Sequence, residues 1–253
     1  MSYDDRFNEQ LRTDNNRFNE LPRALNEDHM SVLFLIDTSG SMGGTPIRNA
    51  EAGVNGFRSF LAADQCRDCV DVCVMAFDDR PRVIADWAPV SVMRDISLDA
   101  GGTTALYDGV DEAIDKIRER STVYTQLNIT ERKPYLIVLS DGYDNASCRD
   151  RASVVAHVSN RINGDKLKLF FLGYGDYDRS AAAALTSAGG TKRSLAFEVS
   201  GPDAPFSEFF DFVTNSVKAA STSAPGALIH VDTTIGTPGS RTKVVELDGW
   251  LNE

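Results

Sequence analysis

Four stretches of this chain are apolar at almost every position, and they limit the possible folds more than any other feature. These stretches are Ser31–Ile36, Val70–Phe77, Tyr135–Leu139 and Leu167–Leu172. A strand with one face in water alternates apolar and polar residues, so an almost continuous apolar run predicts a strand that is buried on both faces. Strands of this kind are typical of a parallel sheet with helices on both sides.

Segments with helical periodicity separate these stretches. Between Pro46 and Leu61, apolar and small residues recur at intervals of three and four, and a proline suits the first turn of a helix. The same spacing over Leu106–Ile117 predicts a second helix. Further helices are predicted at Arg149–Ile162, Arg179–Ala188 and Pro205–Ala219, and a further strand at Leu195–Val199. This alternation predicts an α/β fold, a doubly wound and mostly parallel sheet with helices on both faces.

One short strand departs from the parallel alternation. Arg82–Ala85 follows the strand at Val70–Phe77 after only a few turn-forming residues. It is therefore predicted to return as a short antiparallel strand at the edge of the sheet. The next residues, which include Trp87 and Pro89, are predicted to form a loop.

The two ends of the chain lie outside this pattern. We predict an arm over residues 1–29, the α/β domain over 30–220, and a tail rich in Ser, Thr, Gly and Pro over 221–253. Within the tail, Ala227–Thr233 and Thr242–Leu247 favour extended structure. This composition is equally consistent with a linker and with a strand-like segment that docks on this domain or on a partner.

The composition excludes some classes of partner. Asp and Glu number 37 against 26 Lys and Arg, which gives a net charge of −11. Without a local basic face, such a chain repels nucleic acid and anionic membranes. The first residues lack the basic start and apolar core of a secretory signal, and no apolar run approaches the ~18 residues of a membrane span. We therefore expect a cytoplasmic protein that binds no nucleic acid and does not cross a membrane.

Three of the four cysteines lie close together in the sequence, at Cys66, Cys69 and Cys73. A structural zinc site needs four ligands, and the remaining candidates, Cys148 and the three histidines, are distant. Buried or loop thiols are the favoured interpretation, with a metal or redox site as the alternative.

Carboxylate and hydroxyl side chains gather in three loops at one predicted edge of the sheet. Asp37, Ser39 and Ser41 follow the first strand, Thr104 ends a Gly-rich loop before a helix, and Asp141 follows the third apolar strand. Because ligands of an open parallel sheet bind beyond the carboxyl ends of its strands, we expect these side chains to meet there. Each alone is an ordinary turn or capping residue, but their coincidence in such loops favours a binding site.

Two carboxylates and three hydroxyls without Cys or His are typical of a hard cation, Mg²⁺ first, with Mn²⁺ or Ca²⁺ as alternatives. Mg²⁺ keeps some of its water, so one coordination position remains open to an incoming Asp or Glu carboxylate. This chemistry predicts binding of a partner protein through its acidic side chain. Trp87, Tyr107 and Tyr143 are candidate contacts around the site, and packing of each ring against the sheet is the alternative.

The run Asp37-Thr38-Ser39-Gly40-Ser41 resembles the Asp-x-Ser-x-Ser signature of von Willebrand factor A-type (vWA) domains, called the metal-ion-dependent adhesion site. The segments Gly101–Asp108 and Leu139–Gly142 resemble the second and third loops of that site. The resemblance covers residues 31 to 219 and implies a doubly wound sheet with one short antiparallel edge strand.

The resemblance also implies a role for each residue. Ser39, Ser41 and Thr104 would supply hydroxyl oxygens to the metal, and Asp37 and Asp141 would act directly or through water. Thr103 is the competing candidate for the role of Thr104. In the family pattern a small residue and Leu follow the threonine, which favours Thr104, since Ala105 and Leu106 follow it.

In its compact form without a secretory signal, the chain is similar to bacterial intracellular vWA proteins, including those associated with tellurite resistance. Others of that kind work beside an AAA+ ATPase or a kinase and phosphatase system. A partner of one of these classes is therefore expected.

Two other functions compete with protein binding. A metal-dependent phosphotransferase of the haloacid dehalogenase type would be expected to carry a second Asp at the position of Ser39, and a serine hydrolase would need a histidine near its nucleophile. A flavodoxin-like binder of phosphate or a cofactor would place negative charge beside Asp37 and Asp141. We therefore expect no enzyme activity.

Overall fold

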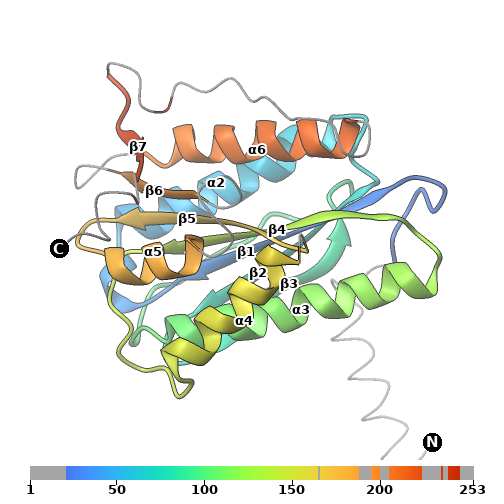
Figure 1. Ribbon diagram of the computed structural model, residues 1–253. Coiled ribbons are helices and arrows are strands. Elements are labelled where there is room, and N and C mark those ends of the chain that lie inside the picture. The colour runs from blue at the N-terminus through green and yellow to red at the C-terminus, as the bar shows by residue number, and fades with distance from the viewer. Residues whose placement is uncertain are drawn as a thin grey trace, which may run out of the picture.

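A sheet of seven strands forms the centre of the computed structural model (Figure 1). The structure describes residues 21–164, 166–187, 195–199, 205–223, 235 and 239–245. The strands lie in the order β3-β2-β1-β4-β5-β6-β7. Their bounds are β1 His29–Asp37, β2 Val70–Phe77, β3 Pro81–Pro89, β4 Glu131–Ser140, β5 Lys168–Tyr174, β6 Leu195–Val199 and β7 Thr242–Val244. Neighbours from β2 to β6 pair in parallel, which confirms the predicted α/β fold.

Both edges of the sheet are antiparallel strands. β3 pairs with β2 as predicted, but it extends over Pro81–Pro89 instead of ending at Ala85. β7 comes from the tail and pairs with β6, so it adds a second antiparallel edge strand beyond the one that was predicted. Thr242–Val244 docks on its own sheet, whereas Ala227–Thr233 lies outside the described residues.

A carboxylate in the first turn of α6 anchors the tail strand. Glu208 Oε2 accepts a hydrogen bond from Ser240 Oγ at 2.7 Å and another from the backbone N–H of Thr242 at 3.0 Å. The Ser240 hydroxyl first, and then the backbone donors, lower the pKa of Glu208 because they stabilise its ionised form. The tail is therefore tied both to the edge of the sheet and to the last helix.

Helices cover both faces of the sheet (Figure 1). They are α2 Thr45–Ala62, α3 Leu106–Gln126, α4 Arg151–Asn163, α5 Arg179–Thr186 and α6 Ser207–Thr222. α2 and α6 lie on one face, and α3, α4 and α5 lie on the other. No helix in the described ranges has the length and apolar character needed to cross a membrane.

The side chains of β1 alternate between the two faces. Phe34 and Ile36 belong to the core with α2 and α6, whereas Leu33 and Leu35 belong to the core with α3. All 9 residues of β1 are buried, as the almost uninterrupted apolar run predicts.

Trp87 lies in β3 rather than in a loop, which corrects the prediction from the sequence. Its side chain is buried, and its indole N–H donates to the backbone carbonyl of Lys116 in α3 at 3.1 Å. Because β3 runs antiparallel to β2, with Ala88 opposite Val72, this part of β3 lies near the amino end of β2. Trp87 is therefore at the opposite end of the sheet from the predicted binding edge.

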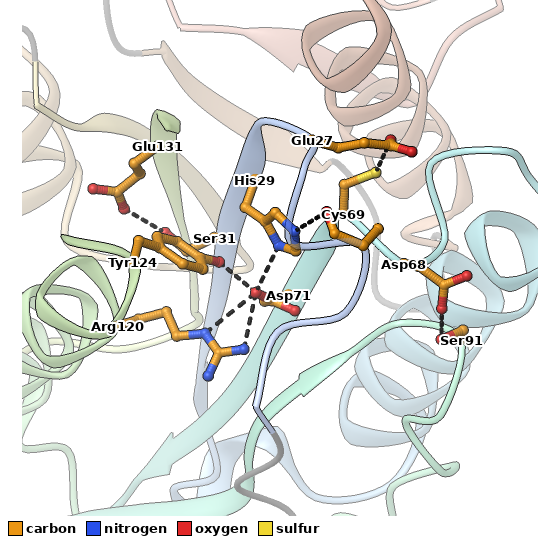
Figure 2. Close-up of polar contacts among 11 residues, drawn as sticks. Glu27, His29, Ser31, Asp68, Cys69, Asp71, Ser91, Arg120, Tyr124 and Glu131 are labelled. Carbon is orange, nitrogen blue, oxygen red and sulfur yellow. Dashed lines mark hydrogen bonds and ion pairs between the residues drawn. The ribbon is translucent and has the colours of Figure 1, made fainter. Parts of the chain in front are cut away.

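A buried polar cluster at the amino ends of β1 and β2 ties α3 to the sheet (Figure 2). Asp71 Oδ2 accepts a hydrogen bond from the Tyr124 hydroxyl at 2.5 Å and pairs with Arg120 Nη2 at 2.9 Å. One nitrogen of the His29 imidazole lies 3.3 Å from the same oxygen, and the other lies 3.4 Å from the backbone carbonyl of Ala24. Because all four side chains are buried, this carboxylate is compensated by protein groups rather than by water.

The clustered cysteines are buried free thiols. None of Cys66, Cys69 and Cys73 forms a disulfide, and Cys69 Sγ donates to Glu27 Oε2 at 3.0 Å (Figure 2). Burial, and then the contact with Glu27, raises the pKa of Cys69 to about 12, which disfavours the reactive thiolate. Over the described ranges, no group of three or more His, Cys, Asp or Glu side chains is placed to hold a metal ion.

The Asp71 cluster predicts a large loss of stability when its carboxylate is removed. We expect Asp71→Ala to lower the free energy of unfolding by about 3–5 kcal/mol, because it removes the carboxylate that pairs with the buried Arg120 charge. Unfolding in urea, followed by circular dichroism, measures this change. Asp95→Ala is the matched control, because it breaks the exposed pair with Arg58, for which we expect at most about 1 kcal/mol. Equal losses in the two variants would contradict this interpretation.

Candidate metal centre

The five predicted ligands come from three loops at the carboxyl edge of the sheet. Asp37 is the last residue of β1, with Ser39 and Ser41 just after it, and Asp141 directly follows β4. Thr104 lies two residues before the start of α3. β1 and β4 are parallel neighbours, so their carboxyl ends lie side by side.

Hydrogen bonds link the first loop to the third. Ser39 Oγ and Ser41 Oγ lie 3.1 Å apart, and Ser41 Oγ donates to Asp141 Oδ1 at 2.8 Å. Thr104 Oγ1 lies 3.5 Å, and Ser41 Oγ 4.0 Å, from the point that a Cβ atom on Gly142 would occupy. The structure thus brings the three hydroxyls and the Asp141 carboxylate together.

Asp37 is fully buried beside these hydroxyls. Its Oδ1 accepts a hydrogen bond from the backbone N–H of Ser39 at 2.8 Å, and its Oδ2 accepts one from Ser140 Oγ at 2.7 Å. Because both oxygens are held, the carboxylate has a defined orientation. The sequence analysis did not select Ser140, although its position at the end of β4, beside Asp141, was a usable signal.

The Gly-rich loop approaches the first loop through backbone contacts. The N–H of Gly40 donates to the carbonyl of Gly102 at 3.1 Å, and the N–H of Gly101 donates to the carbonyl of Thr38 at 2.8 Å. Gly102 has a φ of 80°, a conformation that costs little only for glycine. A Cβ atom at this position would also lie 2.9 Å from Asp79 Oδ1. Glycine at position 102 therefore permits the close approach of the Gly-rich loop to Asp79, which lies between β2 and β3.

The two adjacent threonines have different surroundings. Asp79 Oδ1 accepts hydrogen bonds from the backbone N–H of Thr103 at 2.8 Å and from its hydroxyl at 2.5 Å. The hydroxyl first, and then the N–H, lower the pKa of Asp79. The Thr103 hydroxyl is therefore occupied by Asp79, whereas the Thr104 hydroxyl, like that of Ser41, lies beside Gly142 in the Asp141 loop. This geometry favours Thr104 as the candidate ligand.

The third loop also holds Thr104 by its backbone. Asn145 Oδ1 accepts a hydrogen bond from the N–H of Thr104 at 2.9 Å, and the N–H of Asn145 donates to the carbonyl of Thr104 at 2.9 Å. The sequence analysis did not identify Asn145. A short polar residue after an Asp-Gly turn suggests a cap, but its partner is 41 positions away in the sequence.

The two carboxylates lie in an environment that opposes their negative charge. Burial raises the pKa of Asp37, although hydrogen bonds from Ser39 and Ser140 partly offset this effect. Burial, together with the nearby charge of Asp37, raises the pKa of Asp141 to about 6. Among the described residues, neither carboxylate forms an ion pair with Lys or Arg.

This donor set fits a divalent cation. Two carboxylates without a cationic partner compensate a 2+ charge, and hydroxyl oxygens add hard neutral ligands. Asp37, Ser39 and Thr104 are buried, whereas Ser41 is exposed, so the set is open to solvent on one side. Asp37, Ser39, Ser41, Thr104 and Asp141 could therefore hold a metal and leave a position for an external ligand.

The two remaining aromatic candidates differ in their exposure. Tyr107 is buried in the core with α3, so its ring packs within the domain. Tyr143 is 55% exposed and lies in the loop that carries Asp141, so it can contact a bound partner.

Comparison with known families identifies the chain. A family model described as the von Willebrand factor type A domain matches residues 31–211. The chain therefore belongs to the von Willebrand factor type A domain family. No curated protein matches it significantly.

Several solved structures share this fold at low sequence identity. The von Willebrand factor type A protein from Catenulispora acidiphila has a TM-score of 0.51 and 18% identity over 76% of this chain and 43% of its own. The vWF domain of the type V pili tip protein Mfa5 from Porphyromonas gingivalis has a TM-score of 0.54 and 12% identity over 79% and 99% of the two chains. The pilus adhesin SpaC from Lactobacillus rhamnosus GG, in an open conformation, has a TM-score of 0.60 and 11% identity over 81% and 31%. This chain thus spans less than half of the first and third of these structures.

The two threonines offer a direct test of the candidate ligand set. We expect Thr104→Ala to weaken Mg²⁺ binding by at least about tenfold, since even residues that only orient a ligand contribute 10–100-fold. Thr103→Ala, which removes a hydroxyl bonded to Asp79, should leave the Mg²⁺ affinity within about twofold. Isothermal titration calorimetry of both variants measures these affinities. A larger loss of Mg²⁺ affinity in Thr103→Ala than in Thr104→Ala would identify Thr103 as the ligand instead.

Proposed function

We propose that this vWA domain is a protein-interaction module that binds an acidic side chain of its partner through one Mg²⁺ ion, with Mn²⁺ or Ca²⁺ as possible substitutes. The observation that carries the proposal is the convergence of Asp37 and Asp141 with three hydroxyls at an edge where, among the residues that the structure describes, neither carboxylate pairs with Lys or Arg. The proposal assigns a complete metal-ion-dependent adhesion site to this chain.

The five candidate ligands would have two kinds of role in metal binding. Ser39, Ser41 and Thr104 would supply hydroxyl oxygens, and Asp37 and Asp141 would bind directly or through water. When bound, the metal would supply a positive charge that attracts a carboxylate to an open coordination position. Ser140 orients Asp37, so the arrangement of the charged oxygens is set before any ligand arrives.

The proposed partner is a protein that presents an exposed Asp or Glu. SpaC is a pilus adhesin and Mfa5 is a pilus tip protein, so this fold occurs in two proteins of pili, one of them an adhesin. We extend only the general mode, contact with another protein, to this chain. An AAA+ ATPase or a kinase and phosphatase system remains the proposed class of partner.

The geometry around the serines gives no support to catalysis. Of the described histidines, His29 contacts Asp71 at the opposite end of the sheet, and His157 contacts Asp111 between α3 and α4. Neither is placed to activate Ser39 or Ser41. The two carboxylates also oppose a bound phosphate, which disfavours a flavodoxin-like cofactor site.

Removal of the first carboxylate tests the proposal. We expect Asp37→Ala to abolish Mg²⁺ binding in calorimetry and to reduce affinity capture of a partner protein to the level obtained with wild type in a chelator. Because Asp37 is buried, Asp141→Asn serves as a second variant that preserves the side-chain volume and should have the same effect.

Asp95→Ala is the control, because Asp95 is an exposed carboxylate that pairs with Arg58. Wild-type protein that binds no divalent cation, or a partner captured equally well with Mg²⁺, with chelator and by both site variants, would refute the proposed function.

A further inference from the structure

Helix α3 lacks a capping side chain of its own. Its N-cap residue is Ala105, which makes no side-chain capping hydrogen bond. The first N–H groups of an α-helix have no partners within the helix, so a buried helix start needs acceptors from elsewhere. The residues at this start, Leu106 and Tyr107, are buried.

The loop after β4 supplies the missing acceptors. Ser147 Oγ accepts hydrogen bonds from the N–H groups of Tyr107 at 3.0 Å and Asp108 at 3.1 Å. Asn145 Oδ1 accepts one from the N–H of Thr104 at 2.9 Å. The cap of α3 is therefore provided by side chains about 40 residues away in the sequence.

Hydrogen bonds also run in the opposite direction. The N–H groups of Asn145 and Ala146 donate to the carbonyl of Thr104 at 2.9 and 3.2 Å. The Asp108 carboxylate accepts from the N–H groups of Cys148 at 3.0 Å and Arg149 at 2.8 Å. The start of α3 and residues 145–149 thus hold each other through hydrogen bonds of both backbone and side-chain groups.

We infer that Asn145 and Ser147 are positioning residues of the proposed metal centre, which cap α3 from the Asp141 loop and thereby set the orientation of the Thr104 hydroxyl. The inference rests on the proposed function. Asn145 bonds both the N–H and the carbonyl of Thr104, and it lies in the same loop as Asp141. This contact therefore fixes the candidate ligands Thr104 and Asp141 relative to each other.

This arrangement has a consequence for the choice of metal. Mg²⁺ demands near-ideal octahedral geometry at short distances, whereas Ca²⁺ accepts variable ligand numbers and angles. Loss of the Asn145 contact would leave the Thr104 hydroxyl present but poorly oriented. The affinity for Mg²⁺ should therefore fall further than the affinity for Ca²⁺.

The test compares Asn145→Ala and Ser147→Ala with a matched control, Asn55→Ala. Asn55 likewise bonds a backbone segment far away in the sequence, because its side chain bonds both the N–H and the carbonyl of Ile96 at 2.9 and 3.0 Å. Calorimetric titrations with MgCl₂ and with CaCl₂ give the two affinities. Hydrogen exchange of the Thr104 amide, followed by NMR in metal-free protein, reports the cap independently of the metal.

We expect Asn145→Ala to raise the dissociation constant for Mg²⁺ by about 10-fold or more, to raise that for Ca²⁺ less, and to accelerate exchange of the Thr104 amide. Ser147→Ala should show the same direction with a smaller effect. Asn145→Asp retains the acceptor oxygen and should restore the slow exchange, and Asn55→Ala should change neither the metal preference nor the exchange at Thr104.

Unchanged Mg²⁺ binding in Asn145→Ala, or an equal loss in Asn55→Ala, would overturn this inference while the proposed function stands. A wild-type protein that binds no Mg²⁺ would instead overturn the proposed function and the positioning role together.

Discussion

The parallel pairing of β1 with β4 is the constraint on which the site depends. Both strands are buried over most of their length, so polar side chains appear where the strands end. Parallel strands direct their carboxyl ends to the same edge, and Asp37 and Ser140 meet there at 2.7 Å. The Gly-rich loop then closes on this edge through Gly40 and Gly102. The candidate centre is thus a direct consequence of strand direction and strand length.

The carboxylates at the two ends of the sheet have different partners. At the amino end, Oδ2 of Asp71 is compensated by Arg120, Tyr124 and His29 within the core. At the carboxyl end, Asp37 and Asp141 receive hydrogen bonds from hydroxyls and backbone but no ion pair among the described residues. A carboxylate that pairs with buried groups of the protein contributes to stability. Carboxylates without such a pair, at an edge open to solvent, are available to an external cation.

Much of the fold was predictable because local patterns report burial directly. The apolar strands, the helices between them and the antiparallel β3 all appear where periodicity places them. Trp87 was misplaced, because a residue that packs against α3 from an edge strand looks like a loop residue when its neighbours are Pro and Asp. The sequence did not decide where the segment around Thr242–Val244 docks, since its position depends on pairing with the edge of β6 and on the contact with Glu208.

The amino-acid sequence alone determined the class of fold, the type of donor atoms and the three loops that carry them, because these follow from periodicity and from side-chain chemistry. Only the tertiary structure decided which oxygens meet. It directs the Thr103 hydroxyl to Asp79 and leaves the Thr104 hydroxyl beside Gly142, and it shows that Asn145 holds Thr104 from a different loop. The physical reason is that a hydrogen bond between residues far apart in the chain depends on how the intervening elements pack, and no local pattern records that packing.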